Sequence, residues 1–142
     1  MYIADGKTNG PAFSWPDGKR IAVMVTFDYD AEFLRISRAK SKGTSIGFTD
    51  FSRGQYGPHE GLARCLDMLD TMNIKSTFFV PGAVIETYRD TVEEIHRHGH
   101  ELACHGYRHE SDPELSRDEM IKILDKSEAL LAEITGKKPV GH

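Results

Sequence analysis

Short, nearly continuous apolar runs alternate along this chain with segments of helical periodicity, and this alternation is the strongest constraint on its fold. The apolar runs span residues 21–27, 75–80 and 100–104. The helical segments span residues 58–72, 82–98 and 116–136. Apolar runs of this length are typical of strands buried on both faces of a parallel sheet. We therefore expect an α/β fold in which right-handed βα units place flanking helices around parallel strands.

Local signals mark the ends of several elements. Ser116 and Glu119 form a capping-box pattern that predicts the start of the last helix, and Gly136 predicts its end. Residues 139–142 predict the opening of a fourth strand. Residues 31–56 contain several serines and glycines and show no clean periodicity. We expect a long loop there, and unusually long loops are often functional.

Charge, cysteine content and the N-terminal residues exclude several classes of protein. The formal net charge of −4 leaves no basic surface of the kind that binds nucleic acid or a membrane surface. Two cysteines are too few for a disulfide framework. The first residues lack the basic and apolar regions of a secretory signal, and no run approaches the roughly 20 apolar residues of a membrane span. We expect a soluble, cytoplasmic protein.

Two pairs of potential metal ligands follow the first and third apolar runs. Asp28 and Asp30 end the first run, and His105 and His109 follow the third. The carboxyl ends of parallel strands meet at one edge of a sheet, so the two pairs should converge there. One aspartate and two histidines suffice to hold a divalent metal, and the second aspartate could activate a metal-bound water. Strand alternation turns Cys104 away from this edge, so we leave it out of the ligand set.

Each half of this pattern is weak by itself. An aspartate at the end of a strand is usually a helix or turn cap, and two histidines four residues apart more often lie on an exposed helix face. Their occurrence at one sheet edge favours a metal site. A second histidine-rich segment, residues 96–100, is interpreted as structural, because cationic side chains favour helix C-termini. His59 and Glu60 are interpreted as a solvated helix end.

Both motifs are similar to those of the polysaccharide deacetylases, the family with NodB homology that is also called carbohydrate esterase family four. Most members read Thr-Phe-Asp-Asp-Gly in the first motif. Residues 26–31 read Thr-Phe-Asp-Tyr-Asp-Ala, with one extra residue between the carboxylates. Residues 105–109 keep both histidines of the second motif. The resemblance implies that Asp28 is the catalytic base. The metal ligands that it implies are Asp30, His105 and His109.

The resemblance covers residues 15–142 and implies a distorted, incomplete (β/α) barrel. The residue sequence of both motifs is similar to that of a branch of the family without secretory signals. This branch contains peptidoglycan deacetylases and allantoinase-like proteins. In the family the chain continues beyond the position of Gly141 into a groove motif with an arginine and into strands that supply a general acid. We therefore expect residues 1–142 to be a partial catalytic domain, the N-terminal half of the barrel. Because open sheet edges associate, we expect a homo-oligomer or a complementing C-terminal segment to cover this edge.

The resemblance implies metal-assisted hydrolysis of an amide bond in an N-acetylated glycan such as peptidoglycan. Zn²⁺ is the expected metal, and Fe²⁺, Co²⁺ or Mn²⁺ would also suit two imidazoles and a carboxylate. Tyr107 and Arg108 are candidate substrate-binding residues, and a backbone amide near Tyr107 is a candidate donor to the oxyanion. Three alternatives are hydrolysis of a small cyclic amide such as allantoin, a truncated metal-binding module without turnover, and a non-haem iron oxygenase. The βα alternation and the spare aspartate favour hydrolysis over oxygenation.

Overall fold

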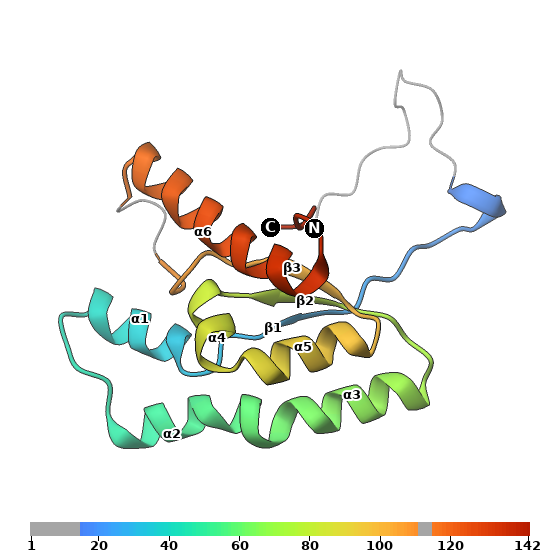
Figure 1. Ribbon diagram of the computed structural model, residues 1–142. Coiled ribbons are helices and arrows are strands. Elements are labelled where there is room, and N and C mark those ends of the chain that lie inside the picture. The colour runs from blue at the N-terminus through green and yellow to red at the C-terminus, as the bar shows by residue number, and fades with distance from the viewer. Residues whose placement is uncertain (1–14, 111–114) are drawn as a thin grey trace, which may run out of the picture.

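A three-stranded parallel sheet organises the chain in the computed structural model, which describes residues 15–110 and 115–142 (Figure 1). The strands are β1 (Thr26–Asp28), β2 (Thr77–Val80) and β3 (Glu101–Cys104), and they lie in the order β1-β2-β3. Phe78 is the partner of both Phe27 on β1 and Leu102 on β3. The α/β class with parallel strands is therefore confirmed. The helices are η1 (Pro16–Gly18), α1 (Phe33–Ser41), α2 (Phe48–Tyr56), η2 (Gly57–Gly61), α3 (Leu62–Thr71), α4 (Gly82–Thr87), α5 (Arg89–Arg97) and α6 (Arg117–Thr135).

The hydrophobic core lies between the sheet and its helices. Every second side chain of β2 and β3 points into it, because strand side chains alternate between the two faces. Figure 1 shows α3 and α5 on one side of the sheet and α6 beside β3. The buried cluster takes Phe78 and Val80 from β2, Leu102 and Cys104 from β3, Leu66 and Leu69 from α3, Val92 and Ile95 from α5, and Leu131 from α6. The core thus fixes one face of the sheet against the helices. The opposite face of the sheet is left open for the site.

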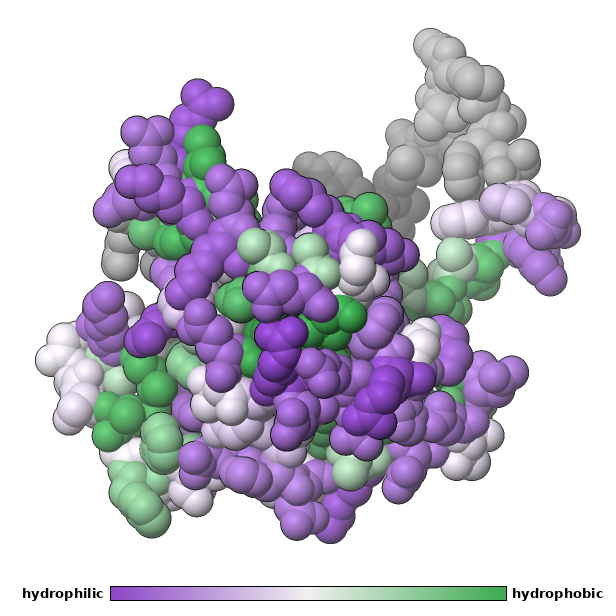
Figure 2. All heavy atoms as spheres, viewed as in Figure 1, coloured by the Kyte–Doolittle hydropathy of each residue, from purple (hydrophilic) through white to green (hydrophobic). Residues whose placement is uncertain are grey.

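The first apolar run does not form the buried strand that we expected over residues 21–27. Only Thr26–Asp28 is a strand, and Ile21, Val23 and Met24 are 76%, 82% and 87% exposed. Figure 2 shows apolar residues along the arm that leads from η1 to β1. The reason is geometric: β2 pairs with one edge of β1, and no strand among the described residues pairs with its other edge. An apolar run is buried on both faces only where a second layer covers it.

Residues 31–56 are not the long loop that we expected. They contain α1 and α2, which pack on each other. At Gly54 of α2 an added Cβ would lie 2.4 Å from the Cα of Glu32, so only glycine permits this close contact. The helix that we predicted from residue 58 begins earlier, at Phe48. It continues through η2, which is a turn of π-helix. Pro58 lacks an N–H, and the wider turn accommodates the missing hydrogen bond.

The later helices follow their sequence signals closely. The expected helix over residues 82–98 bends at Tyr88, which separates α4 from α5. The capping box is confirmed, because the Glu119 amide donates to the Ser116 hydroxyl and the Ser116 amide donates to the Glu119 carboxylate. Gly136 ends α6 in a left-handed conformation with φ 73°. No helix among residues 15–110 and 115–142 is long and apolar enough to cross a bilayer.

The predicted fourth strand is present only as a single contact. Residues 139–142 form no strand, but the carbonyl of Gly141 accepts a 2.9 Å hydrogen bond from the amide of Cys104. A Cβ added at Gly141 would lie 3.2 Å from the Cβ of Ala103. Gly141 therefore occupies the free edge of β3, where a fourth parallel strand would continue the sheet.

Candidate metal centre

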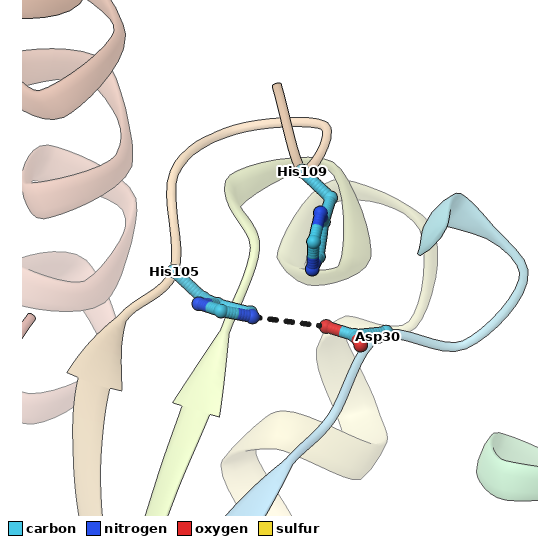
Figure 3. Close-up of side chains that lie close together, drawn as sticks. All are labelled: Asp30, His105 and His109. Atoms are coloured by element: carbon cyan, nitrogen blue, oxygen red, sulfur yellow. Dashed lines mark ion pairs between the residues drawn. The ribbon is translucent and has the colours of Figure 1, made fainter. Parts of the chain in front are cut away.

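Asp30, His105 and His109 converge at the carboxyl ends of the strands (Figure 3). One ligand atom from each side chain lies within 4.8 Å of the other two, and no other such cluster occurs in the described part of the chain. The Nε2 atom of His105 lies 3.5 Å from Oδ1 of Asp30, and the two imidazole centroids are 4.8 Å apart at 85°. The convergence that the motif spacing predicted is present.

The chemistry of the cluster fits a divalent cation. Oδ1 of Asp30 and Nε2 of His105 are buried and have no hydrogen-bond partner among the described residues. Buried polar atoms are normally paired, and a metal ion would use both lone pairs. Burial raises the pKa of the Asp30 carboxyl, and the nearby imidazoles of His105 and His109 act against that rise. Two imidazoles and one carboxylate are a ligand set for Zn²⁺ or a similar transition metal.

The extra residue in the first motif places both carboxylates on the same face of the sheet. Phe27 and Tyr29 pack in the core, so the alternating residues Asp28 and Asp30 project from the opposite, open face. The Tyr29 amide donates to the Phe79 carbonyl at 2.8 Å, which continues the β1–β2 pairing beyond the strand. The Tyr29 hydroxyl donates to Oγ1 of Thr91 at 2.8 Å, and burial raises the pKa of Tyr29 to about 12. Tyr29 therefore anchors the segment from its buried side.

The loop that carries both histidines is held by the N-terminus of α4. The amide of Gly82 donates to the carbonyl of Gly106 at 3.0 Å, and the amide of Ala83 donates to the carbonyl of Tyr107 at 2.8 Å. These are amides that a helix start leaves without partners in the helix itself. The loop turns through two left-handed residues, Gly106 with φ 68° and His109 with φ 59°. Its path is thus fixed by backbone contacts.

Two further residues, both missed by sequence reasoning, fasten this loop. The carboxylate of Glu110 accepts from the amides of Tyr107 at 3.0 Å and Arg108 at 2.9 Å. The hydroxyl of Ser37 on α1 donates to the carbonyl of His109 at 2.6 Å. The backbone amides of Tyr107 and Arg108 are engaged by Glu110 in this structure, and a role for an amide near Tyr107 as an oxyanion donor stays a prediction. No local sequence pattern links Ser37 to His109, which lie on different elements.

The side chains of Tyr107 and Arg108 make their recorded contacts outside the metal-ligand cluster. The Tyr107 hydroxyl donates to the Glu86 carboxylate at 2.6 Å, and the Nζ atom of Lys126 lies 3.7 Å from the Tyr107 ring centroid. The hydrogen bond from Tyr107 and the contacts of Lys126 lower the pKa of Glu86. The Arg108 side chain is exposed, with Cζ 5.7 Å from the same ring. Tyr107 thus ties the loop to α4 and α6, and a role for either residue in substrate binding stays a prediction.

A buried carboxylate supports the segment that follows Asp30. Glu32 is 5% exposed, and the Tyr88 hydroxyl donates to its two carboxylate oxygens at 3.1 and 3.0 Å. The nearby carboxylate and the burial of the phenol raise the pKa of Tyr88, with burial the larger cause. Ala31, between the two acids, adopts φ 49°. The chain after Asp30 is therefore held between α2 and the α4–α5 bend.

Cys104, His59 and the histidine-rich segment at residues 96–100 lie outside the metal-ligand cluster, as the sequence indicated. Cys104 is buried in the core. His98 contacts Asp70, with Nδ1 2.7 Å from Oδ2, and Nδ1 of His100 accepts from the Ser76 amide at 3.3 Å. His59 and Glu60 are both exposed on η2. None of these residues belongs to the metal-ligand cluster.

A pocket of about 420 Å³ opens directly beside the ligand histidines. His105 and His109 line one side, and α6 supplies an apolar wall that includes Met120, Ile123 and Leu124. A small uncharged group could therefore lie next to the metal ligands. Glu110 and Glu128 also line this pocket, so its wall is partly acidic.

The chain is similar to proteins of one family along most of its length. The family model for polysaccharide deacetylase matches residues 16–142. A peptidoglycan deacetylase of Helicobacter pylori is 34% identical over 124 residues, which cover 87% of this chain and 41% of that protein. A peptidoglycan deacetylase-like protein of Gibberella zeae is 34% identical over 125 residues, covering 87% of this chain and 36% of the relative. The chain thus spans less than half the length of these curated relatives.

Two solved structures match the fold. A crystal structure from Mycobacterium smegmatis assigned as a polysaccharide deacetylase aligns with a TM-score of 0.80 and 39% identity, covering 94% of this chain and 46% of that one. The crystal structure of Puue allantoinase also aligns with a TM-score of 0.80, at 21% identity, covering 94% of this chain and 49% of that one. At that identity the second match supports the fold alone. Both matches agree with a partial barrel.

Proposed function

Because this chain belongs to the polysaccharide deacetylase family, we propose that it forms the metal-binding part of a hydrolase that cleaves the amide bond of an N-acetylated glycan. The observation that carries the proposal is the convergence of Asp30, His105 and His109, with Asp28 on the same face. The chain covers less than half of its curated relatives, so the activity is proposed for the protein of which these residues are part.

The proposed chemistry assigns a separate task to each group. Asp30, His105 and His109 would hold the cation, for which we propose Zn²⁺ on the basis of the donor set. A bound divalent metal supplies Lewis acidity and lowers the pKa of water towards about 7. Asp28 takes the proton of the attacking water as the water oxygen bonds to the acyl carbon. The C–N bond then breaks as the nitrogen takes up the proton that Asp28 removed from the water, which gives a carboxylic acid and an amine and returns Asp28 to its ionised form.

Metal content is the first test of this proposal. Purified wild-type protein should hold close to one transition-metal ion per chain, whereas Asp30→Ala and His105→Ala should lose it. Asp125→Ala, which removes an exposed carboxylate on α6, is the matched control and should keep the metal. A wild-type protein that stays metal-free after supplementation with zinc would contradict the proposed site.

Turnover separates the proposed reaction from its alternatives. Acetate release from an N-acetylglucosamine oligomer supports the deacetylase, and ring opening of allantoin without acetate release would instead identify a cyclic amide hydrolase. The Asp28→Asn variant should keep its metal and lose at least about a hundredfold in rate, since a positioned base contributes about 10²–10⁴-fold. A metal-loaded protein without turnover on either substrate would identify a non-catalytic metal-binding module.

We also propose that the open side of the sheet is covered in the active protein. Ile21, Val23 and Met24, which precede β1, and Val140, which lies next to the Gly141 contact with β3, are all exposed. Exposed apolar surface and an unpaired sheet edge both favour association. Either a second copy of the chain or a complementing C-terminal segment would bury them. Sedimentation of the isolated chain should therefore show a dimer or larger species, and a stable monomer with a sharp, high thermal transition would contradict the proposal.

A further inference from the structure

The side chain of Tyr107 lies in a narrow slot between α4 and α6. A Cβ added at Gly82, the first residue of α4, would lie 2.6 Å from Cδ2 of Tyr107 and 2.9 Å from Oγ of Ser127. The ring therefore packs against the glycine, next to a buried serine of α6. A single residue separates Tyr107 from His105 and from His109. A displacement of the Tyr107 backbone would therefore move both imidazoles.

Two exposed charged side chains close this slot. The Tyr107 hydroxyl donates to the Glu86 carboxylate of α4 at 2.6 Å, and the Lys126 ammonium of α6 lies 3.7 Å from the Tyr107 ring centroid. The Nζ atom of Lys126 is also 3.1 Å from Oε1 of Glu86. Each of the three groups thus contacts the other two, and together they join α4, the histidine loop and α6.

The ion pair between Lys126 and Glu86 would contribute little by itself, because solvent screens exposed pairs of this kind. The hydroxyl of Tyr107 changes this, since a short hydrogen bond to an ionised carboxylate is stronger than one between neutral groups. The ammonium is in addition attracted to the negative face of the ring. Both contacts act on the same side chain, so their combined effect falls on Tyr107.

We propose that Lys126 and Glu86 are positioning residues for the metal centre, on which they act by clamping the Tyr107 side chain. The proposal rests on the metal site proposed above and adds two residues to it, neither of which belongs to the ligand cluster. The clamp acts on the backbone as well, because the Tyr107 carbonyl accepts a hydrogen bond from the Ala83 amide at 2.8 Å. Loss of the clamp lets the loop leave this amide more often, so the imidazoles are less often oriented for a metal.

Amide hydrogen exchange on the metal-free protein tests the clamp. Lys126→Met keeps an apolar stem without the charge, and exchange of the Ala83 amide should become about two- to fivefold faster, as expected for an exposed cation–π contact. Glu86→Ala removes a charged acceptor and should accelerate this exchange about tenfold. The Tyr29 amide, which donates to the Phe79 carbonyl, is the internal reference and should keep its wild-type rate. Unchanged exchange at Ala83 in both variants would overturn the proposal.

Metal binding distinguishes positioning from a merely structural contact. Competition with a chelator should show zinc binding weakened about two- to fivefold in Lys126→Met and about tenfold in Glu86→Ala. The visible absorption of Co²⁺ bound in place of zinc should change with the ligand geometry. Lys126→Arg should restore wild-type behaviour, because a guanidinium also stacks on an aromatic ring. Lys122→Met removes an exposed cation one turn earlier on α6 and, as the matched control, should leave affinity and spectrum unchanged.

These measurements separate a failure of this proposal from a failure of the metal site. A wild-type chain that takes up no metal would overturn the metal site, and the positioning role with it. If the wild type binds zinc and both variants retain its affinity and cobalt spectrum, the positioning role alone is overturned, even where the Ala83 amide exchanges faster.

Discussion

The hydroxyl of Ser37 donates a 2.6 Å hydrogen bond to the backbone carbonyl of His109. This contact joins α1 to a residue in the left-handed region, with φ 59°, whose imidazole belongs to the metal-ligand cluster. A non-glycine residue with a positive φ is held there by its surroundings rather than by its own preference. Ser37 is therefore a positioning residue for the ligand His109.

Replacing Ser37 by alanine should weaken metal binding more than it destabilises the fold. Loss of the hydrogen bond releases the His109 backbone, and removal of partners that orient metal ligands typically costs about tenfold or more in affinity. The free energy of unfolding should fall by only about 1 kcal/mol. Competition with a chromophoric chelator measures the zinc affinity. Ser41→Ala removes a hydroxyl at the exposed end of the same helix, and equal affinities for both variants would disprove the positioning role.

Removing the metal should leave the secondary structure in place. The histidine loop is held by the amides of Gly82 and Ala83 and by the carboxylate of Glu110, none of which needs a cation. We expect far-UV circular dichroism to be unchanged after chelation, and the midpoint of thermal unfolding to rise when zinc is restored, because a ligand that binds only the folded state stabilises it. The His105→Ala variant should show no such rise. Loss of helical signal on chelation would indicate that the metal organises the loop.

A methyl group at Gly54 should destabilise the contact between α2 and the segment after Asp30. The new Cβ would lie 2.4 Å from the Cα of Glu32, so one of the two backbones must move. We expect Gly54→Ala to lower the free energy of unfolding by about 1–3 kcal/mol, the usual cost of overpacking. Gly57→Ala meets no atom within 4 Å and is the matched control. Urea unfolding compares them, and similar midpoints for the two variants would contradict this close packing.

His100 should make the fold less stable in mild acid. Burial lowers the pKa of its imidazole, with the charge of Lys75 as a second cause, and Nδ1 accepts from the Ser76 amide and so must be unprotonated. The unfolded chain, with a histidine pKa of about 6.5, binds the proton first. The stabilisation is therefore fully present above about pH 6.5 and is lost as the pH falls towards the folded pKa.

Urea unfolding at a series of pH values from about 8 down to about 5 measures this effect of His100. His100→Gln retains an acceptor for the Ser76 amide but does not titrate, so its stability should fall less steeply over this range. His96→Gln, at a half-buried position on α5, should follow the wild-type curve. If the His100→Gln curve runs parallel to that of wild type, His100 does not contribute to the pH dependence.

The convergence of Asp30, His105 and His109 could be predicted from the sequence because the position of each residue depends on local information. Asp30 directly follows an apolar run, His105 and His109 directly follow another, and the parallel arrangement brings these points to one sheet edge. The helix ends at Gly99 and Gly136 are likewise local, since both glycines adopt positive φ. Such features need only the residues that form them.

The supporting residues could not be predicted because they act across long separations. Ser37 reaches His109, and Tyr88 reaches Glu32, through contacts between elements whose packing no periodicity encodes. Residues 31–56 form helices because Gly54 lets α2 approach the Glu32 backbone, which is a tertiary effect. Residues 21–24 are exposed because burial requires a neighbouring layer, and composition cannot show whether one is present.

The position of Tyr29 between the two aspartates makes the first motif intolerant of insertions and deletions. Because Tyr29 packs inward while Asp28 and Asp30 face outward, deleting it would turn Asp30 into the core and remove one metal ligand at the same time. A chain with adjacent aspartates in this strand would therefore direct the two carboxylates to opposite faces of the sheet.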